Sequence, residues 1–499
     1  MVGLSYETEK SDWFSAWRDN FLTDNLWNLN LGGTDNMSNS AGAEHWAIAS
    51  VFSRISYNYK HKYIIETNLR YDGSSRFAKN NRWRIFPGIS ASWRISQESF
   101  MKNNKIFDEL KIRGSFGQTG NQEGIRLYDY IQLLELAGST YPFGDGSQTQ
   151  SIKMGSLAGV GRTWEILNNS NIGIDMEFLN NRLGVSFDYF WKVNDNMLIP
   201  ITYPSMLGAT APDSNSGKLR TRGFELTLKW ADKVNKDFSY SVMFQLSDAV
   251  NKLIDYGGAD TYNLGLNAVR EGYPLNSYFA YVYDGVIRNQ AELDEYKKLE
   301  GVPSDIGIGD AKFKDLNKDG KISTYGNGDD GDAVFAGSNA PRYTFGLNLN
   351  AKWKNFDIGA FFQGVGKRTM FRVGEFAMPW SDWWRCPPRF YYGKTWNEDR
   401  QDAYYPRLTY GDIRHWNYQA STLQKINAAY VRLKNLQIGY TLPKKFLQKL
   451  KVERTRVYVS GQDLFEIHNV EGGWDPESAS DGYNYPFQRY YSVGIDITF

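Results

Sequence analysis

The segment Tyr490-Tyr-Ser-Val-Gly-Ile-Asp-Ile-Thr-Phe499 alternates apolar side chains with polar or small ones. Its apolar members are Tyr491, Val493, Ile495, Ile497 and Phe499, and the residues between them are Ser492, Gly494, Asp496 and Thr498. Successive residues of a β-strand point to opposite faces, so a period of two places these sets on opposite sides of one strand. The segment is therefore predicted to be a strand with one apolar and one polar face.

The same alternation recurs along the whole chain. It predicts about fourteen strands, near residues 2–10, 46–59, 63–72, 84–95, 110–116, 166–179, 183–193, 221–230, 238–248, 342–353, 356–366, 428–442, 455–465 and 488–499. The connections between them are alternately brief and long, and the long ones are expected at 117–165, 194–220, 249–341, 367–427 and 466–487. Residues 1–499 are thus predicted to form an all-β fold with its long loops at one end.

The composition excludes several classes of protein. Lys and Arg number 57 against 56 Asp and Glu, so no net charge attracts a nucleic acid, and none is expected as a partner. The single cysteine, Cys386, rules out an internal disulfide and any cysteine-based metal cage. No apolar run approaches the roughly 18 residues of a membrane-spanning helix. The sequence has no GxSxG, HExxH, Walker or CxxC motif, so no catalytic residue and no enzyme activity are predicted.

Alternating short and long connections indicate an outer-membrane β-barrel, which has short periplasmic turns, long extracellular loops and a polar lumen. On this interpretation the apolar set of the last segment faces lipid, whereas Asp496 and Thr498 face the lumen. Two alternatives fit the alternation alone: a soluble β-rich protein that binds glycans, and a passive outer-membrane pore. A propeller is disfavoured, because no repeat of roughly 40–50 residues is visible.

One segment resembles a known family. The run Tyr430-Val-Arg-Leu-Lys-Asn-Leu-Gln-Ile-Gly-Tyr-Thr-Leu-Pro443 is similar to the hallmark segment of SusC-like (RagA-type) TonB-dependent transporters of the bacterial outer membrane. Further segments resemble the same family in the same order, namely Asn68–Phe77 with Asn81–Ser96, Lys111–Gln122 and Tyr490–Phe499. The resemblance covers essentially the full chain and implies a transmembrane antiparallel β-barrel.

The resemblance also implies a function. Members of this family import oligosaccharides or peptides through a barrel of about 22 strands, together with a SusD-like surface lipoprotein and with TonB, which acts through a plug. They are considerably longer than this chain, which is expected to be the C-terminal portion of such a barrel, embedded in outer-membrane lipid. The upstream barrel strands, the plug and the N-terminal domain are expected to lie outside it. Phe499 resembles the C-terminal aromatic residue that the barrel-assembly machinery recognises in outer-membrane barrels.

An aspartate-rich loop is a candidate metal site. A calcium loop supplies oxygens from positions 1, 3, 5, 7 and 9 and has a glycine at the sharp turn. In this loop the glycine is Gly320, and the oxygen positions are occupied, in order, by Asp315, Asn317, Asp319, Lys321 and Ser323. Position 12 is Gly326, so the closing carboxylate is expected from Asp329, Asp330 or Asp332. The pattern predicts a structural Ca²⁺ or Mg²⁺ that braces the loop, and similar Asp-rich loops occur in the family. An Asx-turn satisfied by its own backbone explains the same residues without an ion.

A group of aromatic residues in 367–427 is a candidate substrate platform. Its members are Trp380, Trp383, Trp384, Tyr391, Tyr392 and Trp396. Aromatic faces stack on sugar rings and on peptide side chains, which suits either class of solute. Loop packing or a place at the membrane interface fits the same residues.

A short helix is expected inside the longest loop, from Asn289 to Gly301. Asn289 is the expected N-cap, Glu292 stands at the third helical position, and Gly301 is the expected terminator.

Overall fold

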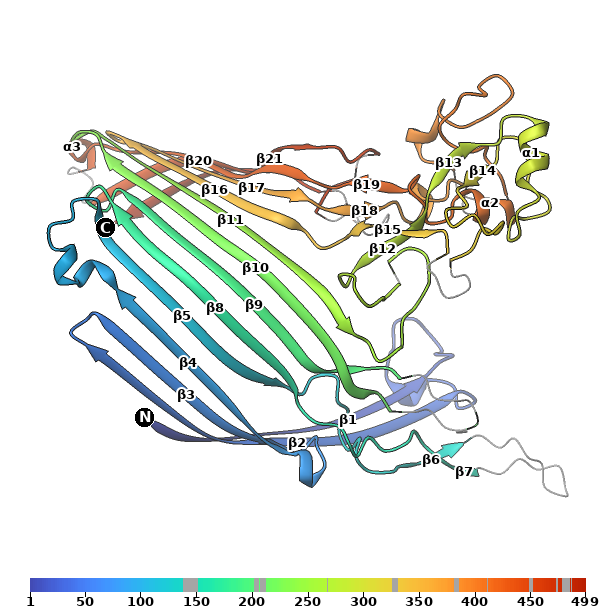
Figure 1. The fold of residues 1–499 in the computed structure, drawn as a ribbon, viewed down its shortest axis with the longest axis horizontal. Helices are drawn as coiled ribbons and strands as arrows, with labels where there is room; N and C mark the ends of the chain where they lie inside the picture. Colours follow the sequence, from blue (N-terminus) through green and yellow to red (C-terminus); the bar gives the residue numbers. More distant parts are fainter. Residues whose placement is uncertain are drawn as a thin grey trace.

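In the computed structural model the chain forms one curved antiparallel sheet of fourteen strands with folded loops at one end (Figure 1). The structure describes residues 1–137, 151–201, 206, 212–266, 268–324, 331–380, 386–410, 412–447, 452–472, 474–477, 485 and 487–499. The strands of the sheet are β1 (Val2–Arg18), β2 (Met37–Tyr59), β3 (Tyr63–Ser74), β4 (Trp83–Arg94), β5 (Phe107–Asn121), β8 (Glu165–Phe178), β9 (Leu183–Ile199), β10 (Ser214–Lys233), β11 (Phe238–Asp255), β16 (Arg342–Trp353), β17 (Phe356–Lys367), β20 (Tyr430–Thr441), β21 (Arg454–His468) and β22 (Tyr490–Thr498). The predicted all-β class and the number and order of the strands are confirmed.

Strands that follow one another in the sequence are neighbours in the sheet, and the connections alternate between brief and long ones. The briefest is Lys354-Asn355 between β16 and β17, where Lys354 has a φ of +54°. In Figure 1 the brief connections lie at the left and the long loops at the right. Among the described residues the sheet is open, because β1 and β22 are its edge strands and each pairs there with a single neighbour.

Several strands extend further than expected, mainly toward the long connections. β9 continues to Ile199 and β10 starts at Ser214, so the loop expected at 194–220 shrinks to 200–213. The added residues, such as Asn194-Asp195-Asn196, are polar on both faces. They therefore lack the alternation that marks a strand in the sequence, although the backbone ladder continues through them.

The register places apolar side chains in rows on one face of the sheet. Val459 of β21 pairs with Ile438 of β20 on one side and with Val493 of β22 on the other. Paired residues of neighbouring strands point to the same side, so the apolar members of β22 share this face, as predicted. Those members, Tyr491, Val493, Ile495 and Ile497, are 50–75% exposed. Phe499 lies just beyond β22 and is 87% exposed.

The opposite face carries charged side chains joined across strands. Arg456 of β21 places its Nη2 2.6 Å from Oδ2 of Asp357 on β17, and its Nη1 3.3 Å from Oδ2 of Asp496 on β22. Arg113 of β5 places its Nε 3.1 Å from Oδ2 of Asp175 on β8. One face is thus apolar and the other polar, which is the arrangement of a transmembrane barrel wall.

Smaller elements lie in the connections. Four two-stranded sheets are formed by β6 (Leu134–Ala137) with β7 (Ser151–Met154), β12 (Ser277–Tyr281) with β15 (Ala333–Ser338), β13 (Tyr283–Val286) with β14 (Ala311–Phe313), and β18 (Thr369–Phe371) with β19 (Lys425–Asn427). In the part of the chain that the structure describes, the α-helices are α1 (Gln290–Tyr296), α2 (Asp412–Asn417) and α3 (Lys444–Leu447), and single 3-10 turns occur at Leu29–Leu31, Lys79–Asn81, Ile95–Gln97, Ser99–Met101, Gly374–Phe376 and Arg389–Tyr391. Within the described residues, no helix has the length and apolar character needed to cross a membrane.

Helix α1 starts as expected but ends early. Oδ1 of Asn289 accepts a hydrogen bond from the amide of Glu292 at 2.9 Å, and Oε2 of Glu292 accepts one from the amide of Arg288 at 3.1 Å. The helix ends at Tyr296 and not at Gly301, which corrects the prediction. Gly301, at a φ of +87°, instead serves a close approach, since a Cβ there would stand 2.5 Å from the carbonyl oxygen of Ile322.

Candidate functional site

The two longest connections, residues 256–341 and 368–429, fold together into one unit at the long-loop end, here called the loop subdomain. Backbone hydrogen bonds join them, from the amide of Tyr281 to the carbonyl of Ala420 at 3.1 Å and from the amide of Arg407 to that of Gly309 at 2.9 Å. Buried residues of both connections form its main core: Tyr281, Ile287, Leu293, Tyr296, Ile306, Ala311, Phe313, Ile322 and Trp416. Burial of this apolar surface gives the two loops a fixed relative position.

A buried carboxylate ties the two connections together. Asp310 is 0% exposed and accepts hydrogen bonds from Nε and Nη2 of Arg407 at 2.6 and 2.8 Å. It also accepts from Nδ2 of Asn417 at 2.9 Å and from the amide of Gly307 at 2.7 Å. The hydrogen bonds from Arg407 raise the pKa of its guanidinium. The buried charge is thus both paired and hydrogen-bonded, which is what burial of a carboxylate requires.

Tyr391, one of the predicted platform residues, lies inside the loop subdomain. It is 1% exposed and packs with Tyr405, Tyr418 and Leu423 in a second core. Its hydroxyl donates to the carbonyl of Phe376 at 2.7 Å, and burial raises its pKa. Its ring therefore offers no face to a solute, because its neighbours enclose it.

The other predicted aromatic residues differ in their exposure to solvent. Tyr392 is 89% exposed and Trp380 is 41% exposed, so both have ring surface open to solvent. Trp396 is partly buried, and its ring lies against Gly309, which has a φ of +89° and no Cβ to prevent the approach. Trp383 and Trp384 lie outside the described residues. The structure does not bring the group together as a single platform.

Two hollows that share Lys394 open on the loop subdomain. The first, of about 640 Å³, is lined largely by Phe376, Pro388, Phe390, Tyr392 and Arg389. The second, of about 550 Å³, has four cationic side chains against two carboxylates: Arg372, Lys394, Arg400 and Lys425 against Asp402 and Glu471. The second hollow therefore favours an anionic group.

Arg372, one of the cations of the second hollow, is held by a hydrogen bond and by two aromatic rings. Its Nη1 donates to the carbonyl of Leu423 at 2.9 Å, and its guanidinium lies 5.2 Å from the ring centre of Phe390 and 5.6 Å from that of Tyr405. Sequence reasoning missed Arg372, Lys394 and Lys425 as members of an anion site, because they are brought together only by the folding of separate loop segments and share no local motif.

The aspartate-rich loop is held mainly by its own backbone. Oδ2 of Asp315 accepts from the amide of Gly320 at 3.0 Å, and Oδ1 of Asp319 accepts from the amide of Lys321 at 2.9 Å. Asn317 also contributes, because its Oδ1 accepts from the amide of Asp319 at 3.2 Å. The contacts of Asn317 and Asp319, each with the amide two residues on, are Asx-turn contacts, whereas that of Asp315 reaches the amide five residues on.

Asp332 closes this loop. It is 0% exposed and accepts from the amides of Leu316 at 2.6 Å and Ser323 at 3.0 Å. Oδ1 of Asp315 and Oγ of Ser323 are buried and have no hydrogen-bond partner among the described residues. Asp329 and Asp330 lie outside those residues, and within the described part no group of three or more His, Cys, Asp or Glu is arranged to hold a metal. The unpartnered oxygens fit a hard cation, whereas Asp332 is already engaged by the backbone.

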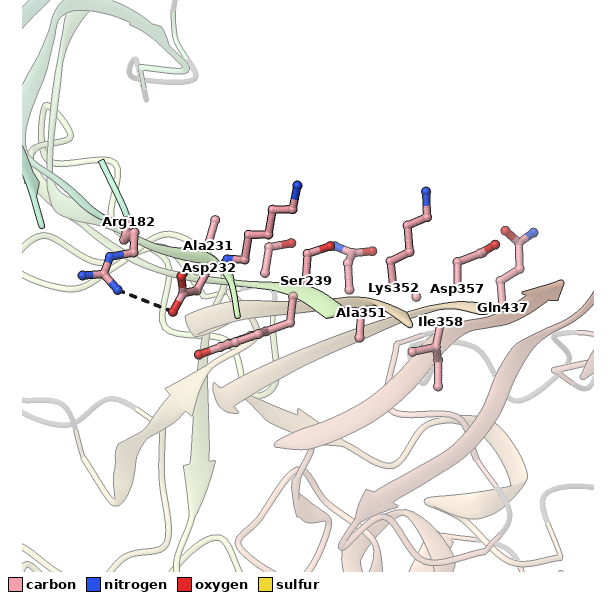
Figure 2. Close-up of a pocket in the computed structure, with 14 residues that line it drawn as sticks. Arg182, Ala231, Asp232, Ser239, Ala351, Lys352, Asp357, Ile358 and Gln437 are labelled. Atoms are coloured by element: carbon pink, nitrogen blue, oxygen red, sulfur yellow. Dashed lines mark hydrogen bonds and ion pairs between the residues drawn. The ribbon is translucent and has the colours of Figure 1, made fainter. Parts of the chain in front are cut away.

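The polar face of the sheet has a shallow hollow of about 730 Å³ near the short connections (Figure 2). Strands β10, β11, β16, β17 and β20 contribute to it. Figure 2 shows Lys352, Asp357 and Gln437 pointing to one side of the sheet, whereas Ala351 and Ile358 point to the other. The inner wall is hydrophilic here, and Arg456 reaches across it to Asp357 and Gln437.

The last connection is tied to the sheet by charge. Arg432 of β20 is 0% exposed, places its Nη1 2.9 Å from Oε1 of Glu477 and forms an ion pair with Asp475. Lys434 places its Nζ 2.9 Å from Oε2 of Glu477. The guanidinium of Arg432 lies 4.3 Å from the ring centre of Phe487. Residues 474–477 are thereby held against the long-loop end of the wall.

A fourteen-stranded wall of this kind has relatives of known family. Residues 2–464 match the family described as TonB dependent receptor-like, beta-barrel. The chain belongs to this family. TonB-dependent receptor barrels lie in the bacterial outer membrane, so the predicted location is confirmed and the soluble β-rich alternative is excluded.

Two relatives and one solved structure illustrate the similarity of this TonB-dependent receptor barrel. TonB-dependent receptor P3 of Formosa agariphila is 28% identical over 530 residues, covering 100% of this chain and 50% of the relative. TonB-dependent receptor SusC of Bacteroides thetaiotaomicron is 26% identical over 482 residues, covering 92% and 44%. The structure of the RagAB peptide transporter has a TM-score of 0.82 at 24% identity, over 100% of this chain and 53% of that one. The SusC-like resemblance is confirmed, and the chain spans about half the length of these relatives.

Proposed function

We propose that this chain forms most of the wall and several extracellular loops of a transporter that imports oligosaccharides or peptides by a TonB-dependent route. The observation that carries the proposal is a wall with a polar inner face joined to a folded loop subdomain that has two hollows of solute size. The likeness to SusC and to the RagAB peptide transporter supports it. The solute crosses unchanged, so no residue is assigned a catalytic role.

The wall must be completed before it can transport. Each unpaired backbone group in hydrocarbon costs several kcal/mol, and β1 and β22 each present one unpaired edge. We assign the partners of these edges to further barrel strands, about eight of them in a barrel of about 22, and assign the lumen to a plug. Co-expression of Met1–Phe499 with such a portion should give a heat-modifiable barrel. A stable, TonB-responsive importer from these residues alone would contradict the assignment.

The partners follow from the same relatives. A SusD-like surface lipoprotein is proposed to cover the loop subdomain, and TonB is proposed to act through the plug, as the SusC-like character implies. Phe499 is proposed as part of the assembly signal, since its side chain is exposed beyond β22. Deleting Phe499 should lower the amount of assembled protein in the outer membrane.

Contact with the solute is proposed at the exposed aromatic and cationic side chains of the loop subdomain. Tyr392 lines the first hollow, Trp380 is 41% exposed, and Lys394 lines both hollows. Of the other predicted aromatic residues, Trp383 and Trp384 stay as predictions, because they lie outside the described residues. A Ca²⁺ or Mg²⁺ in the Asp315–Ser323 loop is proposed to brace this subdomain.

Uptake of labelled oligosaccharides and peptides by cells carrying the native protein tests the proposal. Tyr392→Ala and Trp380→Ala should each reduce uptake of the accepted solute several-fold, because one stacked ring contributes on the order of 1 kcal/mol. Trp27→Ala is the matched control, since Trp27 is 82% exposed but lies in the connection between β1 and β2. Uptake that survives loss of TonB would instead identify a passive pore. Equal effects at all three positions would refute the assigned contact surface.

A further inference from the structure

Positive charge is concentrated at one end of the wall. The described residues of the short connections, 60–62, 95–106, 179–182, 234–237, 354–355, 442–447 and 452–453, are here called the short-turn rim. The rim contains nine Lys or Arg and three Asp or Glu, although the whole chain has a net charge of only +1. A charged surface of one sign at one end of a membrane protein points to a partner of the opposite sign there.

Several of these cations are available for a partner. Lys102, Lys105, Lys444 and Lys445 are exposed, and their ammonium groups form no ion pair with any residue that the structure describes. Lys62, by contrast, is engaged, with its Nζ 2.9 Å from Oε2 of Glu98. The unpaired lysines belong to the two longest segments of the rim, 95–106 and 442–447.

The same two segments also expose large apolar side chains. Phe100 is 68% exposed, Ile106 is 66% exposed and Phe446 is 70% exposed. A surface that mixes lysines with exposed Phe and Ile is typical of segments that lie in the headgroup region of a bilayer. A purely aqueous acidic partner would account for the lysines but not for these side chains.

Two further lysines place the positive charge at the edge of the apolar face. The Nζ of Lys60 lies 5.2 Å from the ring centre of Tyr59, and the Nζ of Lys354 lies 5.6 Å from that of Trp353. Trp353 pairs with Phe356 of β17, so its ring belongs to the apolar rows of the wall. These ammonium groups therefore stand where the hydrocarbon gives way to headgroups.

We propose that the short-turn rim binds the phosphate headgroups of anionic phospholipids in the leaflet that faces the periplasm. The ammonium groups of Lys102, Lys105, Lys444 and Lys445 contact the phosphates, and Phe100, Ile106 and Phe446 enter the boundary between headgroups and acyl chains. Short turns of outer-membrane barrels face the periplasm, which places the rim at that leaflet. The rim thus fixes the depth of the wall in the membrane, independently of the solute that the loops select.

The native protein is first delipidated in a neutral detergent and then titrated with phosphatidylglycerol or with phosphatidylcholine in mixed micelles. The amount of each lipid that the protein retains is measured. Each lysine near an anionic headgroup strengthens binding roughly fivefold, so Lys102→Gln with Lys105→Gln should weaken retention of phosphatidylglycerol by roughly 25-fold. Lys444→Gln with Lys445→Gln should do the same. The matched control, Lys297→Gln with Lys298→Gln, changes two exposed adjacent lysines of the loop subdomain and should leave retention unchanged.

Two additional measurements distinguish lipid binding by the rim from misfolding of the variants and from binding of other anionic partners. Raising the salt from about 50 mM to about 500 mM should weaken retention of phosphatidylglycerol by the unmodified protein and leave phosphatidylcholine unaffected. Equal retention of the two lipids by the unmodified protein, or equal loss in the rim and control variants, would overturn the proposal. Binding of purified cell-wall polymer or of an acidic periplasmic protein, without preference for phosphatidylglycerol, would also overturn it.

Discussion

Replacing Asp310 by alanine should loosen the loop subdomain without unfolding the wall. The change removes the acceptor of four hydrogen bonds, from Nε and Nη2 of Arg407, from Nδ2 of Asn417 and from the amide of Gly307. Breaking a buried ion pair costs about 3–5 kcal/mol when the remaining charge stays buried. Here the Arg407 side chain is 37% exposed and can be rehydrated, so a loss of about 3 kcal/mol in local stability is expected.

Hydrogen exchange of the native protein measures this loss. The amides of Tyr281 and Arg407 are the reporters, because each donates to a carbonyl of the other long connection. A loss of about 3 kcal/mol corresponds to roughly 100-fold lower protection of these amides. Amides of the central strands should keep their protection, and heat-modifiable migration should be unchanged.

A matched change separates this effect from a general loss of charge. Glu300→Gln removes an ion pair of the same subdomain, in which Lys321 Nζ lies 2.6 Å from Oε2 of Glu300 and both side chains are largely exposed. That variant should leave the reporter amides unchanged. Asp310→Asn keeps one acceptor oxygen and should fall between the two. Equal protection in Asp310→Ala and Glu300→Gln would refute the claim that the buried carboxylate joins the two connections.

Three other predictions follow from the wall and the loop subdomain. Ile495 lies near the middle of β22 on the apolar face, so Ile495→Arg should lower the free energy of unfolding, measured in lipid vesicles, by roughly 2–4 kcal/mol. Asp496→Asn should lower it far less, and equal losses would contradict the assigned faces. Lys312 lowers the pKa of Glu292, so the stability gained at the start of α1 is present above the unfolded-state pKa and is lost as the pH falls through the folded value. Proteolysis of the loop below pH 4.5 should therefore rise in the native protein but not in Glu292→Gln. Ca²⁺ should protect the loop from protease with a Kd on the order of 10⁻⁴ to 10⁻³ M, and Asp315→Ala should abolish this protection.

The strands could be predicted from the sequence because the signal for each one is local. Inside the membrane one face must be apolar and the other polar, so every strand there carries its own alternation. The pattern ends where the wall leaves the lipid, because both faces of a strand such as the end of β9 are then polar. The strand ends were wrong for this reason, whereas their number and order were right.

The loop subdomain could not be predicted, since its stability comes from contacts between distant segments. Nothing in the sequence around Asp310 indicates that Arg407 and Asn417 will surround it. The neighbours Tyr391 and Tyr392 look alike in the sequence, yet one is 1% exposed and the other 89%. An aromatic-rich segment therefore predicts either a core or a binding surface. Only the packing of the two long connections against each other determines which of these residues is buried and which is exposed.

The segment that carried the family resemblance also shows why a strict period of two is not enough. Leu433 and Leu436 are three residues apart, which would place them on opposite faces of a regular strand. The register of β20 shifts between Leu433 and Asn435, so that Lys434 is a β-bulge residue and both leucines share one face. The bulge lets Arg432 stay on the polar face, where it reaches Glu477 at 2.9 Å. The irregular spacing is thus the local sequence signal for a bulge that directs charge toward the last connection, at the point where the wall leaves the lipid and the loops begin.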